Sequence, residues 1–173
     1  DIENKSLTHR PDTFGVIGFA REVAAIQGEQ FTTPEWLRVD NAQHTAISEN
    51  SAERLQPTIT IDDSKLSERY QGVVIGGVDG SKPSTLTMQT QLLRSGIRPI
   101  GSIVDITNYL MLVAGQPLHA FDYDKLAAIN DGKIDIHVRG GRANETLKLL
   151  DGRTVQLDKS DIIIANGDTA VAL

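Results

Sequence analysis

The order of helix-like and strand-like patterns along this 173-residue chain predicts an α+β fold, a layered mixed α/β arrangement with mixed sheets and flanking helices. Two observations support this prediction. In three stretches, apolar residues recur every three or four positions, which is typical of helices with one buried face. In other stretches apolar and polar residues alternate or β-branched residues cluster, which is typical of strands. Because the two patterns do not alternate strictly, we do not expect a regular parallel sheet built from strand–helix–strand units.

The first helix is expected over roughly 12–27, where one apolar stripe runs along the sequence. Pro11 is suited to its start and Gly28 to its end. Gly15 and Gly18 lower the helix propensity of this stretch. Close packing or the close approach of a ligand is therefore expected at these two glycines.

Two further helices are expected in the middle of the chain. One begins at Ser84-Thr85, continues with apolar residues near helical spacing, and ends at Gly96. The other covers Ile103 to Ala114, a stretch whose composition fits either a helix or a strand. Its length and the spacing of its apolar residues favour a helix.

Strand-like patterns occupy six short stretches: Thr58–Ile61, Val73–Ile75, Ile134–Val138, Thr146–Leu149, Thr154–Leu157 and Ile162–Ile164. Asp151-Gly152 separates the fourth from the fifth and predicts a hairpin. The third alternates cleanly, which places His137 on its polar face. The three isoleucines of the last stretch predict a strand that is covered on both faces.

Composition and charge exclude several classes of function. The chain has no cysteine, so disulfides, thiolate metal sites and cysteine catalysis are impossible, and a reducing, intracellular setting is expected. The net charge of -6 argues against a surface built to hold nucleic acid. Residues 71–173 are nearly neutral, however, so a contact with a polyanion is more favourable there than in the acidic residues 1–70. No apolar run is long enough to span a membrane, and no membrane partner is expected.

One stretch, residues 95–124, concentrates polar side chains in apolar surroundings. They are Arg98, Asp105, Thr107, Asn108, Gln116, His119, Asp122 and Asp124. Polar groups in an apolar matrix need partners, because burying them unpaired is costly. They therefore either satisfy one another structurally or point into a pocket that offers hydrogen-bond donors and a titratable imidazole.

Two site chemistries remain open for this stretch. In the first, Arg98 and Asn108 orient an ester or carboxylate as hydrogen-bond donors, and His119 positions or deprotonates water. In the second, His119, Asp122 and Asp124 hold a divalent metal, since imidazole and carboxylate are suitable ligands. The spacing of these three residues matches no known metal motif, so we expect no metal site.

Longer blocks of the sequence resemble the bacterial phenylalanyl-tRNA synthetase β subunit. They are THRPDTFGVIGFAREVAAI, GIRPI…VDITNYLML…GQPLHAFDYDKL, IDIHVRGGRANETLKLLDG and DIIIAN…AVAL. The resemblance extends over nearly the whole chain and is loosest over residues 28–68, which are polar and expected to be partly irregular. It identifies residues 1–173 as a single module, the central tRNA-editing module of that subunit, and implies the editing-module fold.

The resemblance implies hydrolysis of tyrosine wrongly attached to the phenylalanine tRNA. A hydrophobic pocket cannot strongly reject a near-isostere that only adds a hydroxyl, so a second site that hydrogen-bonds this hydroxyl is needed. By the resemblance, Arg98 and Thr107 are expected to bind the substrate. Asn108 and His119 are expected to act in catalysis while water attacks the ester, with no general base assigned among them.

The resemblance also implies partners. These are the 3′ end of tRNA(Phe) carrying misattached tyrosine, and the catalytic α subunit of a cytoplasmic heterotetramer. ATP and Mg belong to the synthetic site of the parent enzyme, and no cofactor is expected in this segment. The alternative is a non-catalytic scaffold or tRNA-docking module of the synthetase. The negative net charge and the sparse aromatic residues argue against tight RNA binding by this segment alone.

The chain departs from the family pattern at a few positions. His9 stands where Asn is usual, Gly101-Ser102 where Asn-Asn is common, and Asn144 where Gly is usual. These positions are expected in loops and caps and not in the pocket. The family continues beyond the position of Leu173 with a glycine-rich segment and the Glu that reads the tyrosine hydroxyl. This chain is therefore expected to carry part of the editing site and to be inactive alone.

Overall fold

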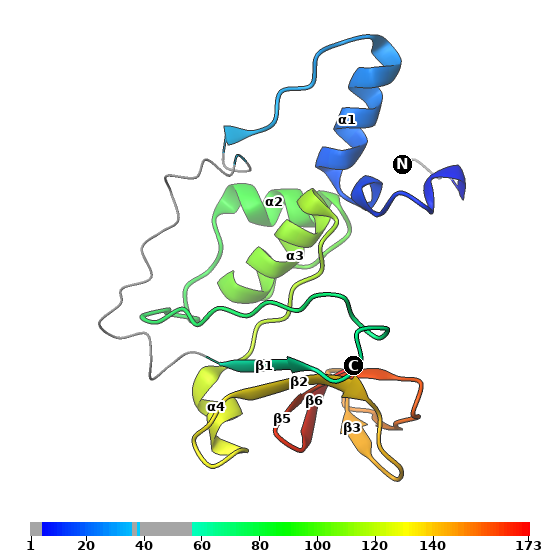
Figure 1. Ribbon diagram of the computed structural model, residues 1–173. Coiled ribbons are helices and arrows are strands. Elements are labelled where there is room, and N and C mark those ends of the chain that lie inside the picture. Colours follow the sequence, from blue (N-terminus) through cyan, green and yellow to red (C-terminus); the bar gives the residue numbers. More distant parts are fainter. Residues whose placement is uncertain (1–4, 36–37, 39–56) are drawn as a thin grey trace. The chain divides into compact units, whose positions relative to one another are not determined.

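The computed structural model describes residues 5–35, 38 and 57–173, and the chain divides into two compact units (Figure 1). Unit 1 consists of Asp1–His44 and Gly77–Ala120, and unit 2 of Thr45–Gly76 and Phe121–Leu173. Part of the expected irregular segment 28–68 lies outside the described residues, and the single module over 1–173 stays a prediction. Helices together with a mixed sheet confirm the predicted fold class. Across the described ranges, no helix is long and apolar enough to cross a membrane.

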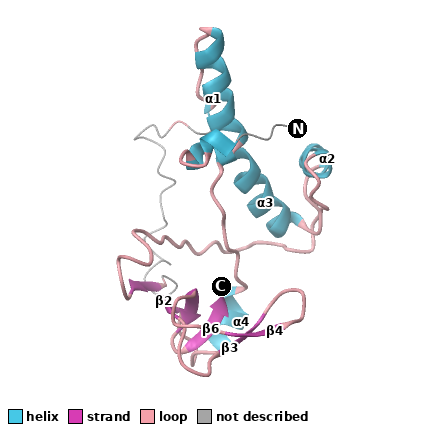
Figure 2. Cartoon of the chain, turned by 90° about the vertical axis from the view of Figure 1, so that its right-hand side faces the viewer, coloured by secondary structure: helices cyan, strands magenta, loops and turns pink. Residues whose placement is uncertain are grey.

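Unit 1 is helical (Figure 2). Its elements are the 3-10 turns η1 (Lys5–Leu7) and η2 (Pro11–Phe14) and the helices α1 (Val16–Gln27), α2 (Leu86–Arg94) and α3 (Ser102–Ala114). Helices α2 and α3 confirm their predictions, and Thr85 caps α2 by accepting a hydrogen bond from the backbone N–H of Met88 at 3.3 Å. Helix α1 begins later than predicted, because η2 comes first and Gly15 is extended, with φ -109° and ψ 152°.

Close packing explains the two glycines near the start of α1. A Cβ on Gly18 would lie 1.9 Å from the carbonyl oxygen of Asp12 in η2. A Cβ on Gly15 would lie 2.3 Å from the backbone nitrogen of Gly115, which follows the last residue of α3. The start of α1 therefore meets the end of α3 backbone to backbone, as Figure 2 shows. The packing explanation is confirmed, and no ligand is needed for it.

Unit 2 is built on a four-stranded sheet of order β1-β2-β5-β6 (Figure 1). The strands are β1 (Thr58–Ile61), β2 (Asp135–Gly140), β5 (Ile162–Asn166) and β6 (Thr169–Ala172). β1 runs parallel to β2, with Thr58 opposite Asp135, whereas the other neighbours are antiparallel. A parallel pair needs a long connection. Here the connection contains the whole second segment of unit 1.

Two apolar clusters cover the two faces of this sheet. On one face, Leu126 of helix α4 (Tyr123–Ala128) packs with Ile136 and Ile164. The other face is covered by a hairpin formed by β3 (Thr146–Lys148) and β4 (Thr154–Gln156). There Ile163 packs with Leu147 of β3 and with Leu157, the residue after β4. The hairpin through Asp151-Gly152 is confirmed. Cover on both faces is confirmed for Ile163 and Ile164, whereas Ile162 remains 45% exposed.

The strand predicted at Val73–Ile75 is wrong. This stretch has no regular secondary structure, and Val73 and Ile75 are 73% and 72% exposed. A β-branched run becomes a strand only where a partner strand and a packing surface are available. Helix α4 and strand β6 were not predicted, since both are short and α4 depends on its cap, Asp122.

Candidate functional site

The four predicted site residues lie in unit 1, on α3 and on the segments directly before and after it. Thr107 and Asn108 are half-buried residues in the middle of α3. Arg98 lies between α2 and α3, and His119 follows α3; both are exposed. Neighbouring residues point about 100° apart around a helix axis. Thr107 and Asn108 therefore project in different directions from α3.

Asp105 fixes the segment before α3. Its carboxylate accepts hydrogen bonds from the Ser84 hydroxyl and from the backbone N–H groups of Ile100, at 2.8 Å, and Gly101, at 3.4 Å. The residue is 1% exposed. The hydrogen bond from Ser84, followed by that from Ile100, lowers the pKa of Asp105 below its ordinary value, so the buried group stays ionised. For Asp105, structural satisfaction explains the polar residue in the apolar stretch.

Glycine contacts fix the other end of α3. Gly115 ends the helix with a φ of 75°, and a Cβ there would lie 3.0 Å from the backbone nitrogen of Gly15 and 3.1 Å from the carbonyl oxygen of Pro11. Next to this contact, Arg10 donates hydrogen bonds to Asp12 at 2.9 Å and to Glu22 at 3.1 Å. The Arg10 contacts join η2 to α1, and the glycine contact places the end of α3 against them.

A shallow apolar hollow of about 420 Å³ lies beside the same contact. Its lining is formed by Thr13, Phe14, Gly15, Val16, Phe19, Ala20 and Leu112. The lining contains none of the four predicted site residues. We therefore do not assign this hollow to the predicted site.

The metal alternative is not supported by the structure. Asp122 caps α4, because its carboxylate accepts a hydrogen bond from the backbone N–H of Lys125 at 3.1 Å. Within the described part of the chain, no group of three His, Asp or Glu side chains is arranged to hold a metal ion. The polar residue Asp122 thus has the ordinary role of a helix cap.

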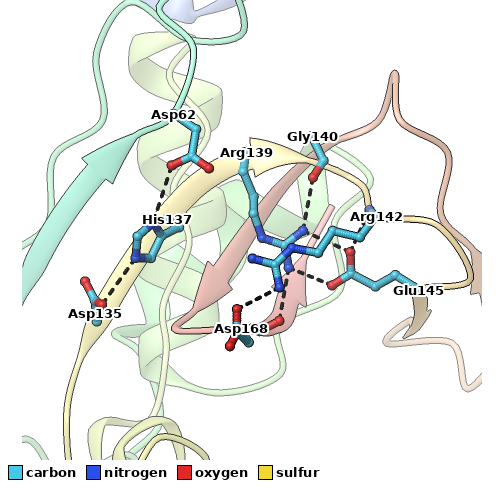
Figure 3. A network of polar contacts seen from close by, with 8 residues as sticks. All are labelled: Asp62, Asp135, His137, Arg139, Gly140, Arg142, Glu145 and Asp168. Carbon is cyan, nitrogen blue, oxygen red and sulfur yellow. Dashed lines mark hydrogen bonds and ion pairs between the residues drawn. The ribbon is translucent and has the colours of Figure 1, made fainter.

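Unit 2 contains a buried ion-pair network that the sequence analysis missed (Figure 3). Arg139 donates two hydrogen bonds to Glu145, at 2.9 and 2.7 Å, and its side chain is 4% exposed. It also donates to the carbonyl oxygens of Gly140 and Asp168, while Arg142 pairs with the Asp168 carboxylate at 2.7 Å. The hydrogen bonds from Arg139 lower the pKa of Glu145 from 4.5 to about 2. The network joins β2 to the turn before β3, which carries Glu145, and to the turn between β5 and β6, which carries Asp168.

His137 lies between two carboxylates on the same strand surface (Figure 3). Its Nε2 is 3.2 Å from Asp135, and its Nδ1 is 3.4 Å from Asp62 at the end of β1. The hydrogen bond to Asp135, and then that to Asp62, raises the pKa of the imidazole above 6.5. Its position on the polar face of the strand is confirmed. The sequence signal for this group of side chains is a titratable residue at every second position of the strand, at Asp135, His137 and Arg139, which places the three on one face.

Comparison with known proteins gives one family and a set of relatives. A model of the B3/4 domain family matches residues 66–173. The phenylalanine–tRNA ligase beta subunit of Xylella fastidiosa (strain 9a5c) is 41% identical over 172 residues, which are 99% of this chain and 20% of that protein. That of Geobacillus kaustophilus is 41% identical over 174 residues, which are 100% of this chain and 20% of that protein. The chain thus spans about a fifth of the length of these relatives.

Proposed function

Because the chain belongs to the B3/4 domain family, we propose that it is part of the tRNA-editing module of a phenylalanine–tRNA ligase β subunit. The reaction proposed for this module is hydrolysis of tyrosine from mischarged tRNA(Phe). The observation that supports the site is the placement of Arg98, Thr107, Asn108 and His119 on one helix and the two segments that flank it, within one unit. Contacts at both ends of that helix fix Ile100 before it and Gly115 after it.

The proposed chemistry is ester hydrolysis. Water adds to the carbonyl carbon of the aminoacyl ester, the acyl–oxygen bond breaks, and the ribose hydroxyl leaves with a proton. Arg98 supplies a charge-assisted donor from an exposed position suited to meeting a polyanion, and Thr107 supplies a hydroxyl. Asn108 supplies an amide donor, and His119 positions or deprotonates the water.

The proposed partners follow from the same premise. They are the 3′ end of tRNA(Phe) bearing tyrosine and the catalytic α subunit, in the cytoplasm. ATP and Mg serve the ligation reaction elsewhere in the enzyme, and we assign no cofactor to this segment. The group that reads the tyrosine hydroxyl is proposed to come from a part of the β subunit outside these residues. Selection for tyrosine by such a group is strong, because phenylalanine would leave a buried polar partner unpaired.

The experiment is deacylation of tyrosyl-tRNA(Phe) by the complete ligase, α and β subunits together. His119→Ala and Asn108→Ala are each expected to slow hydrolysis by about 100-fold, the lower range for loss of a proton-transfer or donor group. Gln116→Ala is the matched control, since Gln116 is exposed on the same segment and donates a hydrogen bond to the carbonyl of the next residue, Pro117, at 3.2 Å. Charging with phenylalanine is expected to remain unchanged in all three variants.

Unchanged deacylation in both His119→Ala and Asn108→Ala would refute the proposed catalytic roles. The docking alternative has a different signature. It predicts normal deacylation in these variants. It also predicts that removing a phosphate contact such as Arg98 weakens tRNA binding and makes the affinity less dependent on salt concentration.

A further inference from the structure

We propose that Asp105 is a positioning residue for the editing site, which holds the segment that carries Arg98 against the helix that carries Thr107 and Asn108. This inference rests on the proposed function and adds a residue to it. Asp105 does not touch the substrate in this proposal. It acts through the place that it gives to Arg98.

The first argument is the way in which Asp105 closes the start of α3. The helix begins after Gly101, which has no side chain to cap it. Asp105 lies one turn inside and reaches back to the N–H groups of Ile100 and Gly101, while its own N–H donates to the carbonyl of Gly101 at 2.9 Å. The carboxylate thus binds the N–H of the N-cap residue Gly101 and of the residue before it, in the way that the acidic residue of a capping box reaches back to the N-cap. The last residues before α3 are bound to the helix itself.

The second argument is that the Arg98 segment is anchored on both sides. Before Arg98, the N–H of Ile97 donates to the carbonyl of Leu92 at 2.9 Å, and Leu92 is completely buried. After Arg98, the N–H of Ile100 donates to Asp105 at 2.8 Å. Arg98 is two residues, or ~7 Å of extended chain, from that second anchor. These two hydrogen bonds therefore hold the backbone on either side of Arg98, from which its exposed side chain projects.

The third argument is the link to α2. Ser84 donates to the second oxygen of the Asp105 carboxylate, and its own carbonyl accepts a hydrogen bond from Gln89 at 2.7 Å. Ser84 immediately precedes the cap of α2, and it is buried like Asp105. One carboxylate therefore joins the start of α2, the Arg98 segment and α3. Removing the carboxylate leaves these donors without an acceptor, which is costly. We therefore expect the donor groups to move when Asp105 is replaced.

The test uses the complete ligase and the kcat/KM for hydrolysis of tyrosyl-tRNA(Phe). Arg98→Ala is expected to lower this value by about 10- to 100-fold, the cost of one charge-assisted hydrogen bond. Asp105→Ala is expected to cause a similar loss. The kcat/KM of the double variant, Arg98→Ala with Asp105→Ala, is expected to lie within about 2-fold of that of Arg98→Ala alone. The reason is that Asp105→Ala acts by displacing Arg98, which the double variant already lacks.

Two further variants separate positioning from general damage. Asp105→Asn is expected to recover most of the activity, since its amide can accept from Ile100 and donate to the Ser84 hydroxyl, which also accepts. Asp79→Ala is the matched control: it removes an Asp–Ser hydrogen bond of 2.6 Å in the same unit, but on an exposed turn. Asp79→Ala is expected to hydrolyse tyrosyl-tRNA(Phe) at the normal rate. Charging with phenylalanine is expected to be unchanged in all the variants. If Asp105→Ala lowers charging, Ser84→Ala replaces it, with a smaller expected loss of about 5-fold.

The outcomes distinguish this inference from the proposed function. Hydrolysis that is slowed by Arg98→Ala but not by Asp105→Ala overturns the positioning role, as do losses that multiply in the double variant. Normal hydrolysis by Arg98→Ala instead refutes Arg98 as a site residue. In that case, amide exchange of Ile100 and Gly101 decides whether Asp105 anchors the segment: faster exchange in Asp105→Ala shows the anchor, and unchanged exchange refutes it.

Discussion

Unit 1 and unit 2 bury apolar side chains to very different extents. Among the described residues, the large apolar side chains that are buried in unit 2 are Leu126, Ile136, Val138, Leu147, Leu157, Ile163 and Ile164. In unit 1 the corresponding residue is Leu92, whereas Phe14, Ile26 and Leu86 are 68%, 77% and 79% exposed. The helical unit is therefore held mainly by caps, backbone contacts and the Asp105 carboxylate. We infer that side-chain packing dominates the stability of unit 2 and that local polar contacts determine the geometry of unit 1.

The largest expected effect is the loss of packing in the sheet unit. Ile163→Ala is expected to lower the free energy of unfolding of unit 2 by about 4 kcal/mol, because Ile163 is completely buried between sheet and hairpin. The measurement is urea unfolding combined with amide exchange of β2 and β5. Ile162→Ala on the same strand, where the side chain is 45% exposed, serves as the control and should cost clearly less. Equal losses in the two variants would contradict the packing of this face.

The next effect concerns the ion pair of unit 2. Glu145→Gln is expected to destabilise the protein by about 3 kcal/mol at pH 7, because it leaves the Arg139 guanidinium without its anion. The pKa of Glu145 is lowered in the folded state, so its contribution is complete above pH 4.5 and is lost as the pH falls through about 2. The measurement is the difference in unfolding free energy between wild type and variant from pH 7 to pH 2. A difference that stays constant over this range would refute the pair as its source.

A smaller effect is expected where α1 and α3 of unit 1 meet. Gly15→Ala is expected to cost about 1–3 kcal/mol locally, because the added methyl group meets the backbone of Gly115 at 2.3 Å. Amide exchange should become faster in α1 and in the last turn of α3. Gly76→Ala is the control, since no atom lies within 4 Å of a Cβ at that exposed position. Protection that is unchanged in Gly15→Ala would show that the contact is not needed to hold these helices together.

The smallest effect is expected at His137. A raised pKa means that folding favours the protonated ring, so the stabilisation is complete below pH 6.5 and is lost as the pH rises through the folded-state pKa. His137→Gln is expected to cost about 0.5–1 kcal/mol at pH 5.5 and less at pH 9, in keeping with a partly exposed pair. Thermal unfolding at the two pH values measures this difference. A cost that grows with pH would contradict the two ion pairs of the imidazole.

Local signals in the sequence predicted the elements whose causes are local. Thr85 caps α2, and Asp151-Gly152 turns the hairpin, and both follow from the chemistry of a few neighbouring residues. The start of α1 could not be placed, because the break at Gly15 reflects its contact with Gly115, far along the chain. The failed strand at Val73–Ile75 has the same origin, since nothing local says whether a β-branched run finds a partner.

The same limit applies to the site. The polar cluster around α3 was visible in the sequence, yet the sequence could not divide it into structural and reactive members. Asp105 proves to be structural through Ser84, which precedes α2, and Asp122 through its cap of α4. The Arg139–Glu145 pair was missed, because two opposite charges six residues apart predict no contact without the turn between them. The roles of Arg98, Thr107, Asn108 and His119 stay predictions that the deacylation experiments test.

The parallel pairing of β1 with β2 has a consequence for the order of folding. A growing chain emerges from the ribosome from its N-terminus, so β1 appears first, then Gly77–Ala120 of the helical unit, and only then β2. Until β2 appears, the hydrogen-bonding groups of β1 have no strand beside them in this sheet. Pairing Thr58 with Asp135 then closes a long loop, which slows the search for the native arrangement. We therefore expect nascent chains that end before β2 to expose β1 as an unpaired edge, a natural target for chaperones.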